Sequence, residues 1–405
     1  MFKDFSWSLI SKLSFNIFSF ILTPLLIIGL GDSYSVIIFF AAYAGFLSFV
    51  DGGYSFLIVK KITDRTSLSK AKNVFQSSET SLIYFSFIIA ILSYFIIKQF
   101  SLLPRATFII IIMGLSEGFL RIYMRILRSY SNARGVLVSY SKREVVYATL
   151  RFCIVLIFVE MKLNLSSVLL SMVIINVIFV FEERLRINFS FNFKAFKNWS
   201  ALDHKFILTH SSLSLLASIT VYLDKIIIKS YMTDSLYIDY MISHKFSYLL
   251  LVLSNPLSTI LIRYFSNDSN EKLKVSWILK LLTLSIIIYF IIYLTTPFIL
   301  KLWLGNNLND NIIYLSRIFM ISSMFLLLSQ VPYSYFVSKS KNKFQLMMSI
   351  ISCVFTFLNI YYYILTNNHF QLAINSVLIG VIITIIYYYK FYKHVFIKHN
   401  NTNIG

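Results

Sequence analysis

Charged residues are scarce in this sequence. They make up 13% of the 405 residues, whereas an ordinary soluble domain has roughly 25%. Hydrophobic residues reach 58%, and the mean hydropathy is +0.74. A water-facing surface cannot be built from this composition. A soluble globular protein is therefore excluded, and the lipid bilayer is the solvent that the chain requires.

Cysteine and the common catalytic motifs are also lacking. Cys153 and Cys353 are the only cysteines, and each lies in an apolar segment, where cysteine behaves as a small hydrophobic residue. We therefore expect no disulfide and no metal site. The GxxxxGK motif of an ATP-driven pump is absent and the six histidines are scattered, so no catalytic residue is assigned. The net charge of +20 lies in loops, which argues against nucleic acid as a partner.

Long apolar runs, by contrast, are abundant. A helix of about 20 such residues crosses the roughly 30 Å hydrocarbon core of a bilayer. We therefore predict an all-α polytopic membrane protein with about twelve transmembrane helices. Their approximate ranges are 6–28, 34–59, 80–97, 106–127, 144–159, 165–183, 206–228, 236–262, 277–300, 312–336, 344–365 and 371–389.

The distribution of lysine and arginine among the loops predicts the orientation. Basic residues resist translocation, so cytoplasmic loops are enriched in them. One set of alternate loops carries 24 lysines and arginines and the other set carries five. This asymmetry places both termini in the cytoplasm.

Several landmarks recur after a shift of 202 residues, about half the chain. Asp32 superimposes on Asp234, and Lys61 superimposes on Arg263. Each half has an even number of helices, so both enter the membrane from the same side and the repeat is parallel, as in many transporters. The predicted domains are an N-terminal six-helix bundle (1–187), a cytoplasmic interfacial linker (188–205), a C-terminal six-helix bundle (206–392) and a cytoplasmic tail (393–405).

Polar side chains follow one face of the first segment. Lys12 and Asn16 belong to this stripe, which continues at helical spacing in both directions. The equivalent face of the seventh segment is also mostly polar. Both stripes are expected to line a water-filled cavity between the halves. The alternative is that small polar residues join neighbouring helices by hydrogen bonds.

Ionisable residues within a membrane-spanning helix are costly and indicate a functional site. Glu117 and Arg121 lie one helical turn apart in the fourth segment, so they pair with each other or face water. Arg151 and Lys245 lie roughly 12 to 14 Å deep in the fifth and eighth segments, at 1.5 Å per residue. For Arg151 and Lys245, a structural ion pair is the alternative to a role in substrate binding or gating.

Two groups of residues nearer the membrane surfaces are candidate gate contacts. Asp51, Gly52 and Gly53 lie near the inner end of the second segment, and Asp224 and Lys225 lie near the outer end of the seventh. Solvation by lipid headgroups explains residues at these depths equally well.

The deep charges are mostly positive, which favours an anionic ligand. Arginine matches phosphate oxygens with two parallel hydrogen bonds, and lysine supplies a point charge. A lipid diphosphate would satisfy several such cations. The predicted substrate-binding residues are Lys12, Asn16, Arg121, Arg151 and Lys245.

Short stretches spread along the whole chain carry a family resemblance. They are Asp51-Gly52-Gly53, Tyr222-Leu223-Asp224-Lys225-Ile226-Ile227-Ile228 followed by Tyr240, Leu302-Trp303-Leu304-Gly305, and Asn359. Together they resemble the O-antigen, or polysaccharide, flippase (Wzx) family. That family belongs to the multidrug/oligosaccharidyl-lipid/polysaccharide (MOP) exporter superfamily.

The resemblance implies a flippase of a bacterial inner membrane, without enzymatic activity or cofactor. Its substrate would be an undecaprenyl-diphosphate-linked oligosaccharide, an O-antigen or capsule repeat unit, carried from the inner to the outer leaflet by alternating access. It implies coupling to a proton or sodium gradient, for which Glu117 is the candidate residue. Besides the bilayer and this lipid, the partners to which it points are a polysaccharide polymerase and a chain-length regulator.

Two other functions stay open. An O-antigen polymerase or ligase has similar hydropathy, but such enzymes need a sizeable periplasmic loop with catalytic arginine or histidine. Here the outer loops have about a dozen residues or fewer. A drug exporter of the same fold is the other alternative, because fold does not fix substrate. Such exporters usually bind cations, which the excess of deep lysine and arginine disfavours.

Overall fold

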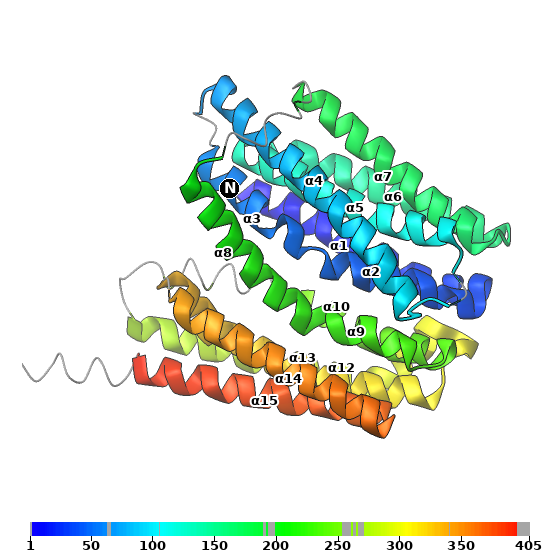
Figure 1. Ribbon diagram of the computed structural model, residues 1–405. Helices are drawn as coiled ribbons and strands as arrows, with labels where there is room; N and C mark the ends of the chain where they lie inside the picture. The colour runs from blue at the N-terminus through cyan, green and yellow to red at the C-terminus, as the bar shows by residue number, and fades with distance from the viewer. Residues whose placement is uncertain are drawn as a thin grey trace, which may run out of the picture. The chain divides into compact units, whose positions relative to one another are not determined.

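The computed structural model describes residues 2–62, 66–104, 106–188, 192, 199–252, 261, 265, 271–339 and 341–394. Every secondary-structure element in these ranges is a helix (Figure 1). The helices fall into two compact units, Met1–Ile238 and Asp239–Gly405. The prediction of an all-α polytopic protein is confirmed.

The first unit holds the helices that form the candidate site. Its α8 packs along α3. The bundle and linker boundaries predicted from the sequence stay predictions. The elements are α1 (Phe2–Leu30), η1 (Gly31–Ser33), α2 (Tyr34–Phe46), α3 (Phe49–Lys61), α4 (Leu68–Gln99), α5 (Phe108–Ala133), α6 (Leu137–Glu160), α7 (Leu165–Ile187), α8 (Ala201–Ser218), η3 (Ile219–Leu223), α9 (Asp224–Ile227) and η4 (Ile228–Ser230).

The second unit contains most of α10 and four further long helices. Among these, α13 packs against α12, α14 and α15. The elements are α10 (Asp234–Val252), α12 (Glu271–Leu304), η5 (Gly305–Asn307), α13 (Asp310–Ser338), α14 (Asn342–Thr366) and α15 (His369–Tyr392).

The helices coincide with the apolar segments expected from the sequence. Among the described residues, eight segments are long and apolar enough to cross a membrane. Helices α5 and α6 are not among them, although they have 26 and 24 residues. They carry Glu117, Arg121 and Arg151. Charged residues within these two helices therefore set them apart from the eight apolar segments.

Several helices extend beyond the apolar segment that predicted them. Helix α4 begins at Leu68 and α6 begins at Leu137, ahead of the expected starts near 80 and 144. Hydropathy locates only the apolar part of a helix, whereas the added turns are polar. One of these turns carries Glu79, which is fully buried.

The second expected segment is interrupted rather than continuous. Helix α2 ends at Phe46 and α3 begins at Phe49. The end of α8 and the π-helical turn η3 lie against this break. The hydroxyl oxygens of Ser48 and of Ser218, the last residue of α8, are 3.3 Å apart, and Gly45 contacts the ring of Tyr222 in η3. Glycine permits this approach because any Cβ at position 45 would overlap the ring.

Four helices of the first unit surround the candidate site. Helix α5 lies between α3 and α7, and α6 packs against α1 and α7. Ring contacts fix these pairings: Phe18 of α1 stacks on Phe152 of α6 at 5.0 Å, and Tyr147 of α6 meets Phe179 of α7 at 4.6 Å between centroids. Residues on α1, α5, α6 and α7 can therefore converge inside the unit.

Candidate functional site

Glu117 and Arg121 form the ion pair that their spacing on α5 allows. The Arg121 Nε donates a hydrogen bond to Glu117 Oε1 at 2.8 Å. One turn of helix separates the two residues, which puts their side chains on the same face. This pair anchors the site on α5.

Helices α6 and α7 bring two more donors to the same carboxylate. The Arg151 Nη2 donates to Glu117 Oε1 at 2.6 Å, and the Asn176 Nδ2 donates to Glu117 Oε2. Three helices thus meet at one carboxylate. We call Glu117, Arg121, Arg151 and Asn176 the Glu117 cluster.

The Glu117 cluster is buried and carries a net positive charge. Glu117 is 4% exposed and Arg151 is 8% exposed. Two guanidinium groups face one carboxylate, so one positive charge is left uncompensated within the cluster. The Arg151 Nη1 is buried without a hydrogen-bond partner among the described residues. A charged donor left in this state costs free energy, which makes this atom a candidate ligand contact.

Helix α1 supplies an aromatic wall for the cluster. The ring of Phe15 lies 6.0 Å from the Arg121 guanidinium and 5.4 Å from that of Arg151. Aromatic faces attract cations at these distances. Asn16, the next residue, is half-buried on the same helix. The side chain of Lys12 lies outside the described residues, so its predicted role stays a prediction.

Asn176 and Phe15 are not among the site residues predicted from the sequence. Asn176 is the uncharged polar residue in the middle of the apolar run of α7, and a search for charged residues passes over it. A search for any polar side chain at mid-membrane depth would have found it. Phe15 lies between two members of the predicted polar stripe, Lys12 and Asn16, but 39 phenylalanines are present in the chain.

Other arginines in the same unit form closed pairs with buried carboxylates. Arg184 of α7 donates to both oxygens of Glu79 on α4, from Nε at 2.5 Å and from Nη2 at 3.0 Å. The Tyr123 hydroxyl also donates to Glu79. In this arrangement one guanidinium takes both oxygens of one carboxylate, which is the strong bidentate geometry.

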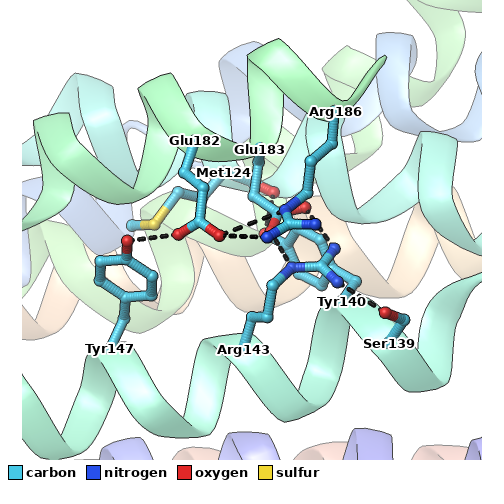
Figure 2. Close-up of polar contacts among 8 residues, drawn as sticks. All are labelled: Met124, Ser139, Tyr140, Arg143, Tyr147, Glu182, Glu183 and Arg186. Carbon is cyan, nitrogen blue, oxygen red and sulfur yellow. Dashed lines mark hydrogen bonds and ion pairs between the residues drawn. The ribbon is translucent and has the colours of Figure 1, made fainter.

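A second closed pair joins α6 to α7, as Figure 2 shows. Arg143 donates to Glu183 through Nε and through Nη2, the latter at 2.8 Å. Beside it, Glu182 accepts hydrogen bonds from the Tyr147 hydroxyl and from Arg186 (Figure 2). The ends of α6 and α7 are therefore held together by a network in which each carboxylate has its own arginine.

The candidate gate residues make local contacts. Asp51 is buried and accepts a hydrogen bond from Ser55, one turn along α3. Gly52 follows it on α3, and Gly53 touches α8 so closely that a Cβ there would lie 2.5 Å from the Ile207 carbonyl oxygen. The close packing of α3 against α8 therefore requires a glycine at position 53, whatever its role in gating.

Asp224 and Lys225 lie just after the π-helical turn η3. Lys225 is buried, and its Nζ donates to Asp224 Oδ1 at 3.0 Å and to the Val221 carbonyl oxygen at 2.5 Å. The lysine thus fastens α9 to the last part of η3. Its predicted role in gating stays a prediction.

Lys245 belongs to the second unit. It lies half-buried on α10, in the residues that follow the division at Ile238 and Asp239. The structure therefore brings together Glu117, Arg121 and Arg151 from the predicted set, whereas Lys245 lies in a separate unit. Its predicted role in substrate binding stays a prediction.

The sequence has no match among protein-family models or curated proteins. The structure is similar to solved transporters. Against the "Lipid II flippase MurJ, inward closed conformation" the TM-score is 0.71 at 15% identity, covering 95% of this chain and 87% of that one.

Two conformations of one transporter type also match. The inward-facing conformation of a multidrug resistance MATE family transporter of the MOP superfamily gives a TM-score of 0.62 at 12% identity, covering 95% of this chain and 94% of that one. The outward-facing conformation gives 0.60 at 14% identity, covering 97% and 96%. The chain is therefore a multi-pass membrane protein with the fold that these transporters share.

Proposed function

We propose that this protein is a flippase for an undecaprenyl-diphosphate-linked oligosaccharide. It would move the headgroup from the cytoplasmic leaflet to the outer leaflet of a bacterial inner membrane. The observation that carries the proposal is the buried Glu117 cluster, whose two arginines outnumber its carboxylate. The fold shared with a lipid II flippase supports the same class of substrate.

The chemistry of the cluster fits a diphosphate. Phosphate oxygens are strong acceptors for guanidinium groups, which offer several donors in a fixed plane. Arg151 has a donor without a partner among the described residues, and the Arg121 side chain is 32% exposed. A diphosphate would take these donors while Glu117 continues to hold both arginines. The prenyl tail would stay in the hydrocarbon core of the bilayer throughout, so its apolar surface would not have to enter water.

Transport would proceed by alternating access, with both termini in the cytoplasm. Solved transporters of this fold adopt inward-facing and outward-facing conformations, which supports this mechanism for the chain. Glu117 is the proposed coupling residue. To accept a proton or sodium ion it would have to release at least one arginine, so ion entry and substrate release would be linked at the same carboxylate.

A drug exporter of this fold is the second candidate function. The similarity to multidrug resistance transporters favours it. A cationic drug, however, would meet the uncompensated positive charge of the Glu117 cluster, and like charges in a site of low dielectric repel strongly. The lipid diphosphate is therefore the preferred substrate.

The test is transport by the purified protein in proteoliposomes. A fluorescent undecaprenyl-diphosphate oligosaccharide is placed in both leaflets, and its accessibility to a membrane-impermeant quencher is followed over time. The wild type should move the probe, and Arg121→Gln should raise KM roughly tenfold or more, since a hydrogen bond to a charged group contributes about 1.5–3 kcal/mol. Arg186→Gln is the matched control, because Arg186 is 53% exposed and pairs with Glu182.

Two results would contradict the proposal. One is a wild type that leaves the lipid diphosphate in its original leaflet but moves a cationic drug. The other is an Arg121→Gln variant with the same KM as Arg186→Gln.

A further inference from the structure

The two oxygens of Glu117 are divided between different kinds of donor. Oε1 accepts hydrogen bonds from Arg121 Nε at 2.8 Å and from Arg151 Nη2 at 2.6 Å. Oε2 accepts from the Asn176 amide. Both guanidinium groups therefore share one oxygen, and the uncharged Asn176 side chain binds the other.

This division differs from the other buried pairs of the same unit. Arg184 takes both oxygens of Glu79, and Arg143 takes both oxygens of Glu183 (Figure 2). Such pairs satisfy two donors of each guanidinium in parallel. At Glu117 the Asn176 amide takes the position at Oε2 that a second arginine nitrogen would take in such a pair, and both guanidinium groups share Oε1.

This arrangement of donors affects the hydrogen bonding of Arg151. Its Nη2 reaches Oε1, but its Nη1 is buried and has no partner among the described residues. With Oε2 available, a closed pair with Glu117 would supply a second acceptor to this guanidinium. Asn176 is therefore the residue that contacts Glu117 where a second donor of Arg151 would otherwise bind.

We propose that Asn176 is a positioning residue for substrate. By holding Glu117 Oε2, it keeps one edge of the Arg151 guanidinium available to donate to an oxygen of a diphosphate. This inference rests on the proposed function for the identity of the transported molecule, but binding of the diphosphate group can be measured without transport.

The surroundings of the cluster indicate how a diphosphate reaches this edge. The centre of the Phe15 ring lies 6.0 Å from the Arg121 guanidinium and 5.4 Å from the Arg151 guanidinium. Both cations therefore lie near the same aromatic ring. The Arg121 side chain is 32% exposed, whereas Arg151 is 8% exposed, so a diphosphate that approaches the cluster would meet Arg121 before Arg151.

Two substitutions of Asn176 test the proposal. Asn176→Asp keeps the shape of the side chain but adds a carboxylate that can pair with Arg151. Asn176→Leu removes the amide and frees Glu117 Oε2, so that Arg151 can close its pair. Both changes should satisfy Arg151 within the protein and weaken anion binding roughly tenfold, the effect of one lost hydrogen bond to a charged group.

The measurement is calorimetric titration of the full-length protein in detergent with inorganic pyrophosphate. Ser171→Ala is the matched control, because Ser171 is a buried polar residue of the same helix that donates to the Val168 carbonyl oxygen. This control should bind pyrophosphate like the wild type. If Asn176→Leu does not fold, Asn176→Ala, which also removes the amide without adding a charge, takes its place.

A double-mutant cycle separates positioning from general damage to the fold. In an Arg151→Gln background, the uncharged change Asn176→Leu should have no further effect on pyrophosphate affinity, because the residue through which Asn176 acts is absent. A wild type that does not bind pyrophosphate would overturn the proposal, as would Asn176 variants that bind it like Ser171→Ala. A wild type that binds pyrophosphate with the predicted Asn176 dependence, but does not move the lipid in proteoliposomes, would refute the flippase function and leave the role of Asn176 standing.

Discussion

Tyr222 of the π-helical turn η3 lies with its ring against Gly45 of α2. A Cβ at position 45 would overlap the ring, so Gly45→Ala should destabilise the protein by about 1–3 kcal/mol, the usual cost of overpacking a core. The measurement is thermal unfolding of the purified protein in detergent. Gly118→Ala is the control, because its Cβ would lie 3.5 Å from the nearest atom, the Ala44 Cβ. A Gly45→Ala variant as stable as this control would show that η3 can move to accommodate the methyl group without loss of stability.

The charge balance of the Glu117 cluster predicts a second stability effect. Glu117→Gln leaves the buried Arg151 and the half-buried Arg121 against an uncharged amide. Removal of one partner from a buried ion pair costs about 3–5 kcal/mol. The unfolding temperature in detergent should therefore fall, and ion-coupled transport should be lost.

A compensating substitution checks the cause of that loss. Glu117→Gln combined with Arg151→Gln removes one charge of each sign, so the double variant should regain much of the stability lost by Glu117→Gln alone. Equal or greater instability of the double variant would mean that shape, rather than charge, dominates at this position. Undiminished coupled transport by Glu117→Gln would exclude Glu117 as the coupling residue.

The closed pair between Arg184 and Glu79 predicts a contrast between two arginines of α7. Glu79 is fully buried, so Arg184→Ala leaves a buried carboxylate with the Tyr123 hydroxyl as its donor and should cost about 3–5 kcal/mol. Arg186→Ala should cost less than about 1 kcal/mol, since Arg186 is 53% exposed and surface ion pairs contribute little. Chemical or thermal unfolding of the two variants side by side measures the difference. Similar losses in both would mean that the Glu79 pair contributes no more than a surface pair.

The orientation predicted from basic residues can be tested by cysteine labelling. A cysteine-free background is made with Cys153→Ser and Cys353→Ala. Lys301→Cys, at the exposed end of α12, should react with a membrane-impermeant maleimide in intact cells, whereas Lys341→Cys, exposed before α14, should react only after the cells are opened. The reverse pattern would place the termini outside.

The helices were predictable from the sequence because their signal is local. A run of apolar residues long enough to cross a bilayer identifies a helix wherever it stands in the chain, and the fold class followed from counting such runs. The break at Leu47 and Ser48 was not predictable, because it depends on the contact between α2 and η3, which are distant in sequence.

The candidate site was predictable in part. Glu117 and Arg121 pair across one helical turn, which spacing alone reveals. Arg151 joins them from a different helix. Hydropathy does not predict the rotation of α6 about its axis that brings Arg151 there. Glu79 was not predictable for another reason: it lies just before the apolar run of α4, so hydropathy places it outside the membrane, although the helix continues through it and buries it.

The end of α7 divides consecutive side chains between two neighbours. Glu183 points to Arg143 of α6, and the next residue, Arg184, reaches Glu79 of α4. Each added residue turns a helix by about 100°, so one insertion between Asn176 and Glu183 would rotate every one of these groups away from its partner while leaving the hydropathy of α7 intact. The number of residues in this stretch is therefore fixed by ion-pair geometry. Natural variation in length is expected in the connections before and after α7 instead.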